Sequence, residues 1–394
     1  MQAIFPSVLK NILEGIKMFK FTEEQLMIRD MVREFTANEI EPRDRDMDEN
    51  GFDFDLIPKL TEAGLMAIHL PEEYGGGGGN TIISEIVINE IAKGSASVAL
   101  FLDAHWLAAD MILYHGTEEQ KAKYLPLVAE GKVFAFGLTE SNAGSDAAAI
   151  KSVAEKQADG SYILNGGKAW ITNSGIADYY LIMAKTDPEA GNKGISVFVV
   201  PKDAEGLTVG KFEKKMGMRG TGTCELSFDN IRISADDRVG PEGRGFMIAM
   251  QALDGARVSI GSIASGLMQH AMEKAVKYAK ERTTFGKPIC KYQAVGFKFA
   301  DMAAKIHATD LMIWDTCQMK DEGQRISVEA AELKLLSSRW ACEVTDDCIQ
   351  IHGGNGYNRE FDVERFYRDA KLLEIGEGTS EILRLVISGS VIGR

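Results

Sequence analysis

The segment Leu372-Leu373-Glu374-Ile375-Gly376-Glu377-Gly378-Thr379-Ser380-Glu381-Ile382-Leu383 places a carboxylate between two glycines, at the break between two helical patterns. The flanking glycines remove side chains that would crowd the backbone, so a flat ligand could come close to Glu377. Apolar neighbours would desolvate this carboxylate and raise its pKa, which suits a general base that takes a weakly acidic proton. A purely structural interpretation is the alternative: Gly378 ends one helix, and Thr379 or Ser380 caps the next.

The composition is that of a globular protein with several domains. The chain has 394 residues, of which 45% are hydrophobic and 26% charged, and a formal net charge of -14. Such an acidic chain lacks the basic footprint of a nucleic-acid-binding protein. The cysteines are odd in number and show no CxxC spacing, which predicts neither a disulfide framework nor a metal site: Cys224, Cys290, Cys317, Cys342 and Cys348. We therefore expect a reducing compartment, the cytoplasm or, in a eukaryote, the mitochondrial matrix.

The sequence predicts no membrane span. The most apolar stretch, Val98 to Tyr114, is interrupted by Asp103, His105 and Asp110. Residues 1–17 are apolar and loosely helical but contain no arginine and no small-residue cleavage site, so they resemble neither a transit nor a secretory peptide. We interpret them as an N-terminal extension.

Residues 18–133 read as an all-helical domain. Thr22 and Gln25 form a capping-box pair, and the same Thr-Glu-Glu-Gln string returns at Thr117 to Gln120. Helical patterns also cover Asp55 to Ala67, Ile82 to Lys93 and Val98 to Tyr114. The glycine-rich stretch Tyr74 to Asn80 has no preceding strand and no following Lys-Ser/Thr, so we predict a flexible surface loop instead of a phosphate cradle.

Residues 134–242 predict a compact antiparallel β domain or barrel. Short β-rich runs follow one another there without intervening helices: Tyr162 to Asn165, Tyr179 to Ala184, Ile195 to Val200 and Glu225 to Ile233. From residue 243 to 394 the pattern is helical again. One face has the heptad-like spacing of a helix inside a bundle: Phe299, Met302, Ile306, Ile313 and Cys317.

Two stretches in the β region could meet a ligand. Phe134 to Asp146 is a strand that ends in small and hydroxylated residues, which offer N–H groups and hydroxyls. In Lys168 to Asn173 the indole of Trp170 could stack on a flat ring while the Thr172 hydroxyl reaches a ring heteroatom. A β-turn and a core tryptophan are the structural alternatives.

Together with Glu377, these stretches resemble the acyl-CoA dehydrogenase family of FAD-dependent flavoproteins. The resemblance runs from Phe21 to Arg394 and departs from many members at Ser141, where they have proline. Four signatures carry it, in the family's order: Leu138-Thr139-Glu140 with Ala143-Gly144-Ser145-Asp146; Trp170-Ile171-Thr172-Asn173; Glu281 to Pro288 with Gln293; and Gln350-Ile351-His352-Gly353-Gly354 followed by Glu377-Gly378-Thr379-Ser380.

The resemblance implies an α+β multidomain fold with an N-terminal helical domain, a middle antiparallel β-barrel and a C-terminal four-helix bundle, assembled as a homotetramer. FAD would lie between barrel and bundle, partly across a subunit interface. Its implied contacts near the flavin are Phe136, Leu138, Thr139, Ser145, Trp170, Ile171 and Thr172. The remaining implied cofactor contacts are Arg282, Phe285, Gln293, Gln350, Ile351, Gly353, Gly354, Thr379 and Glu381.

The resemblance also implies a mechanism. Glu377 would take the α-proton of an acyl-CoA thioester while a hydride leaves the β-carbon for flavin N5, giving a trans-2-enoyl-CoA. Some relatives place the base at the position of Ala256, which cannot act here. The implied substrate contacts are Ser145, Asp254, Arg257, Gly378, Asp103 and Gly376. An electron-transferring flavoprotein would reoxidise the cofactor.

The acyl group is the least determined feature. Medium-chain relatives carry tyrosine where this chain has Gly376, so we expect a wider site and a short, branched or alicyclic acyl group. Trp106 would shorten the acyl end, although helix packing explains Asp103, His105 and Trp106 equally well. An enoyl-CoA reductase, an acyl-CoA oxidase and a non-catalytic CoA-binding protein remain the alternatives.

Overall fold

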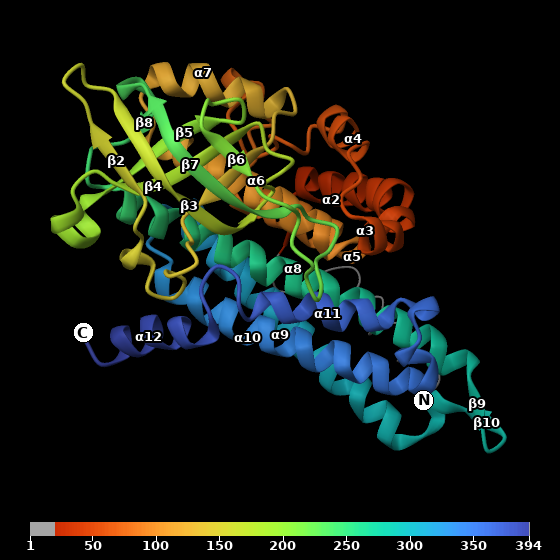
Figure 1. The fold of residues 1–394 in the computed structure, drawn as a ribbon. Coiled ribbons are helices and arrows are strands. Elements are labelled where there is room, and N and C mark those ends of the chain that lie inside the picture. The colour runs from red at the N-terminus through yellow and green to blue at the C-terminus, as the bar shows by residue number, and fades with distance from the viewer. Residues whose placement is uncertain (1–19, 394) are drawn as a thin grey trace.

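The computed structural model describes residues 20–393, so the predicted extension of residues 1–17 lies outside the described residues. Helices begin the chain, a sheet follows, and long helices end it (Figure 1). The N-terminal helices are α2 (Glu23–Phe35), α3 (Asp44–Asn50), α4 (Leu56–Glu62), α5 (Thr81–Gly94), α6 (Ala96–His115) and α7 (Glu118–Ala129).

Local sequence signals set the ends of several of these helices. Both predicted capping boxes are present, at Thr22 before α2 and at Thr117 before α7. The helix predicted over Asp55 to Ala67 is shorter, because α4 ends at Glu62 and Gly64 adopts a φ of 71°. A left-handed glycine just after the last turn is a common way for a helix to end.

The glycine-rich stretch at residues 74–80 forms a surface loop as predicted, but hydrogen bonds hold its backbone in place, so the predicted flexibility is wrong. Four successive glycine N–H groups, from Gly76 to Gly79, donate hydrogen bonds to carbonyls of residues 67–71. A Cβ atom at Gly76 would lie 2.1 Å from the Leu70 carbonyl oxygen, and one at Gly79 would lie 2.8 Å from that of Ile68. These glycines therefore allow two backbone segments to pack against each other.

The middle region forms one mixed sheet of eight strands, in the order β6-β7-β3-β2-β4-β5-β8 with β1 paired to β4. Its strands are β1 (Phe134–Gly137), β2 (Val153–Lys156), β3 (Tyr162–Thr172), β4 (Tyr179–Lys185), β5 (Ile195–Pro201), β6 (Leu207–Val209), β7 (Thr223–Ile233) and β8 (Arg238–Val239). The prediction of an antiparallel barrel is only partly correct. Strands β1 and β2 run parallel to β4, and the strand order ends at β6 and β8, which do not pair with each other in the described part of the chain.

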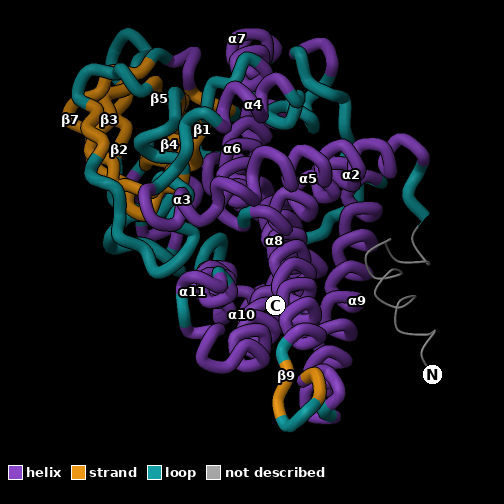
Figure 2. The backbone as a smooth tube through the Cα atoms, turned by 90° about the vertical axis from the view of Figure 1, so that its right-hand side faces the viewer, coloured by secondary structure: helices purple, strands orange, loops and turns teal. Residues whose placement is uncertain are grey.

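The C-terminal region is a bundle of long helices. Helix α8 (Gly245–Glu281) is followed by the hairpin β9 (Thr283–Thr284) and β10 (Lys287–Pro288), and then by α9 (Gln293–Asp321), α10 (Ser327–His352), α11 (Val363–Leu373) and α12 (Ser380–Val391). Helix α8 packs against α9, α10 and α11 (Figure 2). Helix α12 packs against α10. The heptad positions predicted for α9 face the bundle, since Met302, Ile306, Ile313 and Cys317 are fully buried.

Helix α6 lies in the centre of the molecule. It contacts α5, α8 and strand β1, so it joins all three regions. The helix is long and apolar enough to cross a membrane, but 89% of its most apolar stretch is buried inside the protein. Such burial is expected of a core helix.

Candidate active site

Glu377 lies in the turn between α11 and α12, in a backbone conformation that is uncommon for a residue with a side chain. Its φ is 55° and that of Gly378 is 105°. The turn is held by Gly376 N–H, which donates to the Leu372 carbonyl, and by the Thr379 hydroxyl, which accepts from Ile382 N–H. A left-handed non-glycine residue carries strain that surrounding contacts must hold in place. The expected cap is confirmed, because Thr379 caps α12. The expectation that Gly378 ends the preceding helix is wrong, because α11 ends at Leu373 and the turn that carries Glu377 follows it.

The carboxyl group of Glu377 is held in a poorly solvated place. Burial raises its pKa above the usual value, and the nearby Asp103, Lys334 and Arg257 only partly oppose this. Its Oε2 atom is buried and accepts no hydrogen bond from any described residue. A carboxyl with a raised pKa and a free oxygen can take up a proton.

Asp103, on α6, forms a carboxyl pair with Glu377. Asp103 is 2% exposed, and its Oδ2 is also a buried oxygen without a donor in the described part of the chain. Burial first, and then the charge of Glu377, raise the pKa of Asp103 well above the usual range. Two ionised carboxylates can only accept hydrogen bonds, so the pair is stable when one member carries a proton. The pKa values of both carboxyls are raised, so the pair as a whole takes up a proton more readily than two separate carboxyls would.

Two cations hold the main chain of this turn. Lys334 of α10 is fully buried and donates from Nζ to the Gly378 carbonyl at 2.6 Å. Arg257 of α8 donates from Nε to the Glu377 carbonyl at 3.4 Å, and from Nη1 to Asp254 at 2.8 Å. Burial lowers the pKa of Lys334 to about 8. The predicted contacts Asp254 and Arg257 are thus beside the acid, bonded to each other.

Lys334 was not predicted as a site residue. It stands in the run Glu332-Leu333-Lys334-Leu335-Leu336 of a helix, and its neighbour Leu333 is fully buried. A lysine on an apolar helix face is costly unless it has a buried partner. That mismatch was the available signal, but the partner is a carbonyl 44 residues away, which a sequence pattern cannot reveal.

The helix α6 residues next to Asp103 are structural. His105 Nδ1 accepts a hydrogen bond from Phe134 N–H, and burial lowers the pKa of this histidine to about 3. Trp106 is 5% exposed and donates from Nε1 to the Met66 carbonyl. The packing interpretation therefore holds for His105 and Trp106, whereas Asp103 belongs to the site.

The predicted flavin-end residues meet at the ends of β1 and β3. Ala169 N–H donates to the Thr139 carbonyl, and the buried Lys168 bridges the Leu138 carbonyl and Glu140. The β3–β7 register shifts between Lys168 and Ile171, within which Trp170 has a φ of 60° and is 62% exposed. A bulge of this kind turns a side chain outward. It leaves the Trp170 indole available beside the half-buried Thr172, which fits a flat heteroaromatic ring.

Other predicted residues of this group differ in exposure. Ser145 is exposed, Phe136 and Thr139 are half-buried, and Leu138 is buried. The Ile171 side chain is 2% exposed and packs in the core, so only its backbone could meet a ligand. At the turn, Thr379 caps α12, and the side chain of Glu381 is 80% exposed beside Arg384.

A second predicted group lies at the far end of the bundle. Figures 1 and 2 both place the β9–β10 hairpin at the end opposite the sheet. The His352 ring stacks on Tyr278, which brings the end of α10 close to the end of α8. Gly353 and Gly354 are open on the side where a Cβ would stand. This group consists of Arg282, Phe285, Gln293, Gln350, Ile351, Gly353 and Gly354.

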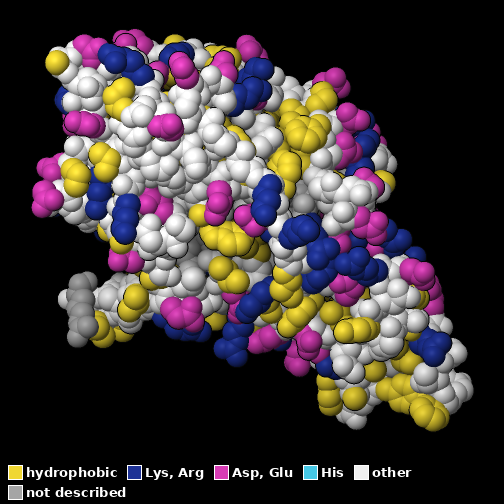
Figure 3. All heavy atoms as spheres, in the orientation of Figure 1, with side chains coloured by type: hydrophobic (Ala, Val, Ile, Leu, Met, Phe, Trp, Pro, Cys, Tyr) yellow, Lys and Arg dark blue, Asp and Glu magenta, His cyan; other side chains and the backbone are white. Residues whose placement is uncertain are grey.

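Within a single chain the Arg282 group lies far from the sheet that carries the flavin-end residues and from the acid turn (Figures 1 and 2). Arg257 and Arg282 lie 25 residues apart on or just after α8, which corresponds to about 37 Å along a helix. Phe285 at the hairpin is 98% exposed, and Figure 3 shows hydrophobic side chains at this end of the molecule. A large exposed aromatic residue at such a tip is typical of an interaction surface.

The structure combines a helical domain, a β domain and a helical bundle, with a buried carboxyl at a break between two helices. Family models match nearly the whole described chain: "Acyl-CoA dehydrogenase, N-terminal domain" at residues 22–132, "middle domain" at 135–231 and "C-terminal domain" at 243–392. The chain belongs to the acyl-CoA dehydrogenase family.

Individual relatives support this assignment over nearly the full length. A short-chain-specific acyl-CoA dehydrogenase of Clostridium acetobutylicum is 42% identical, covering 95% of this chain and 99% of the relative. An acryloyl-CoA reductase (NADH) of Anaerotignum propionicum is also 42% identical, covering 95% and 96%. The structure of butyryl-CoA dehydrogenase from Megasphaera elsdenii matches with a TM-score of 0.93 at 39% identity, covering 95% and 99%.

Proposed function

We propose that this protein dehydrogenates an acyl-CoA thioester between its α and β carbons, with Glu377 as the catalytic base. The observation that carries the proposal is the carboxyl of Glu377, which is buried, has a raised pKa and keeps one oxygen without a donor among the described residues. A surface carboxylate would be a weaker base for the weakly acidic α-proton of a thioester, because water stabilises its charge.

The residues around Glu377 divide the remaining tasks. Its backbone N–H makes no hydrogen bond to any described residue, so it can donate to the thioester oxygen as negative charge develops there. Lys334 and Arg257 hold the two carbonyls of the turn, which fixes the direction of both the N–H and the acid. Asp103 lies beside the base, and its interaction with Glu377 opposes part of the rise in pKa that burial causes. Removal of the α-proton would then leave the Glu377 carboxyl neutral.

The family's cofactor fits the two groups of predicted residues. FAD, when bound, supplies the hydride acceptor. The exposed Trp170 and half-buried Thr172 offer a stacking face and a hydroxyl for a flavin ring, and Arg282 offers a guanidinium for a diphosphate. Because these groups lie at opposite ends of one chain, we propose a homotetramer in which a second copy supplies the Arg282 group.

The proposed acyl group is short, branched or alicyclic. A Cβ at Gly376 would come no closer than 3.7 Å to another atom, and its nearest neighbours belong to Leu372. The backbone there is outside the left-handed region, unlike that of Gly378. Nothing in the fold therefore requires glycine at 376, which supports a role in leaving room for the substrate.

Reduction of an enoyl-CoA is the second candidate. It is favoured by the acryloyl-CoA reductase relative, which is as similar to this chain as the short-chain dehydrogenase is. Glu377 would then donate the proton that it takes in the forward direction. We propose an electron-transferring flavoprotein as the redox partner in either case.

An anaerobic visible spectrum of the purified protein tests these proposals. Butyryl-CoA, isobutyryl-CoA and cyclohexanecarbonyl-CoA are added separately, and loss of the oxidised flavin band reports dehydrogenation. A flavin that only enoyl-CoA reoxidises, after chemical reduction, would favour the reductase. Peroxide formed during turnover in air would point to an oxidase, and a protein that cannot be reconstituted with FAD would contradict both enzymes.

A further inference from the structure

A buried ion pair, Lys168 with Glu140, lies where the two predicted flavin-end segments meet. The Lys168 side chain is fully buried and that of Glu140 is 5% exposed, and their charged atoms are 2.6 Å apart. Burying two charges costs solvation energy, and replacing such a pair with uncharged side chains of similar size is often neutral for stability. The stability of the sheet alone therefore does not explain this pair.

The pair is bonded to the backbone of two neighbouring segments. Lys168 Nζ donates to the Leu138 carbonyl at 3.1 Å as well as to Glu140. Glu140 also accepts from Lys151 N–H at 2.6 Å and from Ser152 N–H at 3.0 Å, just before β2. Burial would raise the pKa of Glu140, but Lys168 and these N–H groups outweigh burial and hold that pKa below its usual value. Glu140 therefore stays ionised and fully bonded.

Lys168 also begins the bulge of β3. The next two residues, Ala169 and Trp170, lie opposite one residue of β7, and Trp170 has a φ of 60°. A left-handed residue with a side chain persists only where its surroundings hold it. Ala169 N–H donates to the Thr139 carbonyl at 2.9 Å, on the side away from β7. The bulge is thus tied to the end of β1.

Lys168 makes most of this connection. Three hydrogen bonds join residues 138–140 to residues 168–169 in the described part of the chain. Two of them come from Lys168 Nζ, and the third is the backbone bond from Ala169 to Thr139. Loss of the lysine would leave a single hydrogen bond to set the spacing of the two segments.

We propose that Lys168 and Glu140 are positioning residues for the flavin ring, because they hold the backbone of Leu138 and Thr139 at a fixed distance from the Trp170 bulge. This inference rests on the proposed binding of FAD between these two segments. Both side chains are buried, so they act through the backbone of their neighbours and not by touching the ring.

Titration of the apoprotein with FAD measures this positioning without turnover. FAD is removed from the purified holoprotein and then added back in steps, while flavin fluorescence reports the affinity and the brightness of the bound form. Stacking on an indole quenches flavin fluorescence, so brightness reports the contact with Trp170. Urea unfolding of each apoprotein measures stability separately.

The main variant combines Lys168→Met with Glu140→Gln. It removes both charges and keeps the approximate size of both side chains, so the urea midpoint should stay near that of the parent. The dissociation constant for FAD should rise about tenfold or more, because both hydrogen bonds from Lys168 are lost. The bound flavin should be brighter, because Trp170 is no longer held against it.

Glu140→Gln alone is the milder test, and it remains decisive if the double variant does not fold. It keeps the Lys168 bond to the Leu138 carbonyl but removes the charged partner of the lysine. FAD affinity should fall in the same direction by a smaller factor, and the bound flavin should again be brighter than in the parent.

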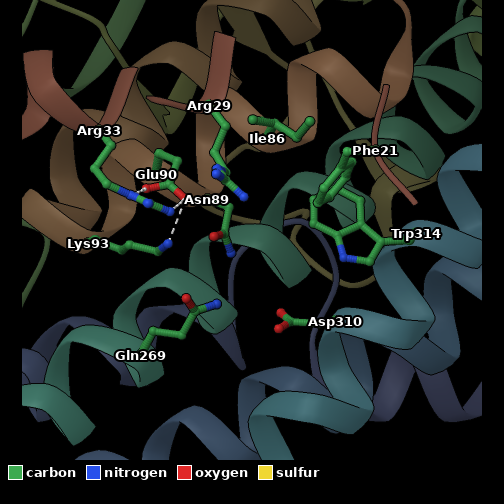
Figure 4. Close-up of a pocket in the computed structure, with 10 residues that line it drawn as sticks. All are labelled: Phe21, Arg29, Arg33, Ile86, Asn89, Glu90, Lys93, Gln269, Asp310 and Trp314. Atoms are coloured by element: carbon green, nitrogen blue, oxygen red, sulfur yellow. Dashed lines mark hydrogen bonds and ion pairs between the residues drawn. The ribbon is translucent and has the colours of Figure 1, made fainter. Parts of the chain in front are cut away.

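The matched control is Lys93→Met with Glu90→Gln. The charged atoms of this pair are also 2.6 Å apart, and the Glu90 side chain is 4% exposed. The pair lies in the helical domain, where the dashed lines of Figure 4 join Glu90 to Lys93 and Arg33. This variant should lose stability, because Arg33 loses its partner, and should bind FAD with the affinity and brightness of the parent.

Parent-like FAD affinity and brightness in both the double variant and Glu140→Gln would overturn the positioning role. Equal weakening in the Lys93 and Glu90 control would also overturn it, by revealing a general response to lost stability. Trp170→Ala tests the proposed flavin site itself and should brighten the bound flavin. If Trp170→Ala changes neither affinity nor brightness, the flavin site is wrong; if it changes them and the Lys168 and Glu140 variants do not, only the positioning role fails.

Discussion

Helix α5 carries two glutamates, Glu85 and Glu90, that are each 3% exposed but lie in opposite electrostatic surroundings. Glu90 accepts from Arg33 at 3.0 Å and from Lys93 at 2.6 Å. Burial alone would raise its pKa, but these two cations outweigh burial and hold it below the usual value. Glu85 has a serine hydroxyl and a more distant lysine, and its pKa rises to about 7.

This difference in surroundings separates acids that stabilise the fold from acids that can gain or lose a proton. A carboxylate that is fully paired stays ionised and joins helices, as Glu90 does for α2 and α5. A carboxyl left with an oxygen that has no donor can gain or lose a proton near neutral pH. Glu85, Asp103 and Glu377 each have such an oxygen in the described structure, and all three are close enough to sense one another's charge.

The largest effect is expected from replacing Glu377, the acid that we propose as the catalytic base. Glu377→Gln should lower the rate of flavin reduction by an acyl-CoA by about a thousandfold, because the amide cannot take the α-proton. Stopped-flow absorbance measures the rate. Glu374→Gln is the control, since Glu374 is three residues away and paired with Lys371, and a similar loss there would refute the assignment.

Removing a paired acid should cost stability instead. Glu90→Gln is expected to lower the free energy of unfolding by about 1–3 kcal/mol near neutral pH, because Arg33 and Lys93 lose their charged partner. The pKa of Glu90 is depressed in the folded state, so its contribution is present above the unfolded value and is lost as the pH falls through the folded one. Urea unfolding at about pH 7.5 and about pH 4 measures both effects. An effect that grew on acidification would contradict this interpretation.

Replacing Glu85 should change the free energy of unfolding in the opposite direction. Its folded pKa is raised to about 7, so its favourable contribution is complete below the unfolded value of 4.5 and is lost as the pH rises to 7. Glu85→Gln should therefore be more stable than the parent by about 1–3 kcal/mol above pH 7, with the gain shrinking toward pH 5. Urea unfolding across this range tests the sign, and a variant that is less stable at every pH would place Glu85 with the paired acids.

The smallest expected effect on stability is at Gly376. Gly376→Ala should change the free energy of unfolding by less than about 1 kcal/mol, because a Cβ has room there and the backbone φ is ordinary. The same change at Gly378, whose φ is 105°, should destabilise by more than this.

The functional consequence at position 376 is a change in acyl preference. A larger side chain, as in Gly376→Tyr, should lower kcat/KM for a branched or alicyclic substrate more than for butyryl-CoA. Steady-state kinetics with both substrates measure the ratio. A ratio equal to that of the parent would show that this glycine does not shape the site.

Much of the architecture followed from local patterns. Capping boxes placed the starts of α2 and α7, and heptad-like spacing identified the buried face of α9. The sheet was less predictable: local alternation marks strands but does not say that β1 and β2 run parallel to β4. The five-glycine stretch misled for a related reason, because the backbone against which those glycines pack is not visible in their own composition.

Prediction of the site residues from the sequence has the same limit. Glu377 could be proposed from the sequence because glycines and apolar residues surround it there. Lys334 and Glu85 each stand as a charge within an apolar helical run, but the carbonyl of Gly378 and the hydroxyl of Ser259 that partner them are 44 and 174 residues away. Without the fold, such a residue cannot be told from a surface charge.

The sequence by itself indicated the family, the three regions and Glu377 as the candidate base, because motifs and hydrophobic periodicity are local properties of the chain. Only the tertiary structure decided which acids are paired and which are left to exchange protons. The pKa of a buried group depends on burial and on charges brought in from other helices, and these arise only when α5, α6, α8 and the acid turn pack together.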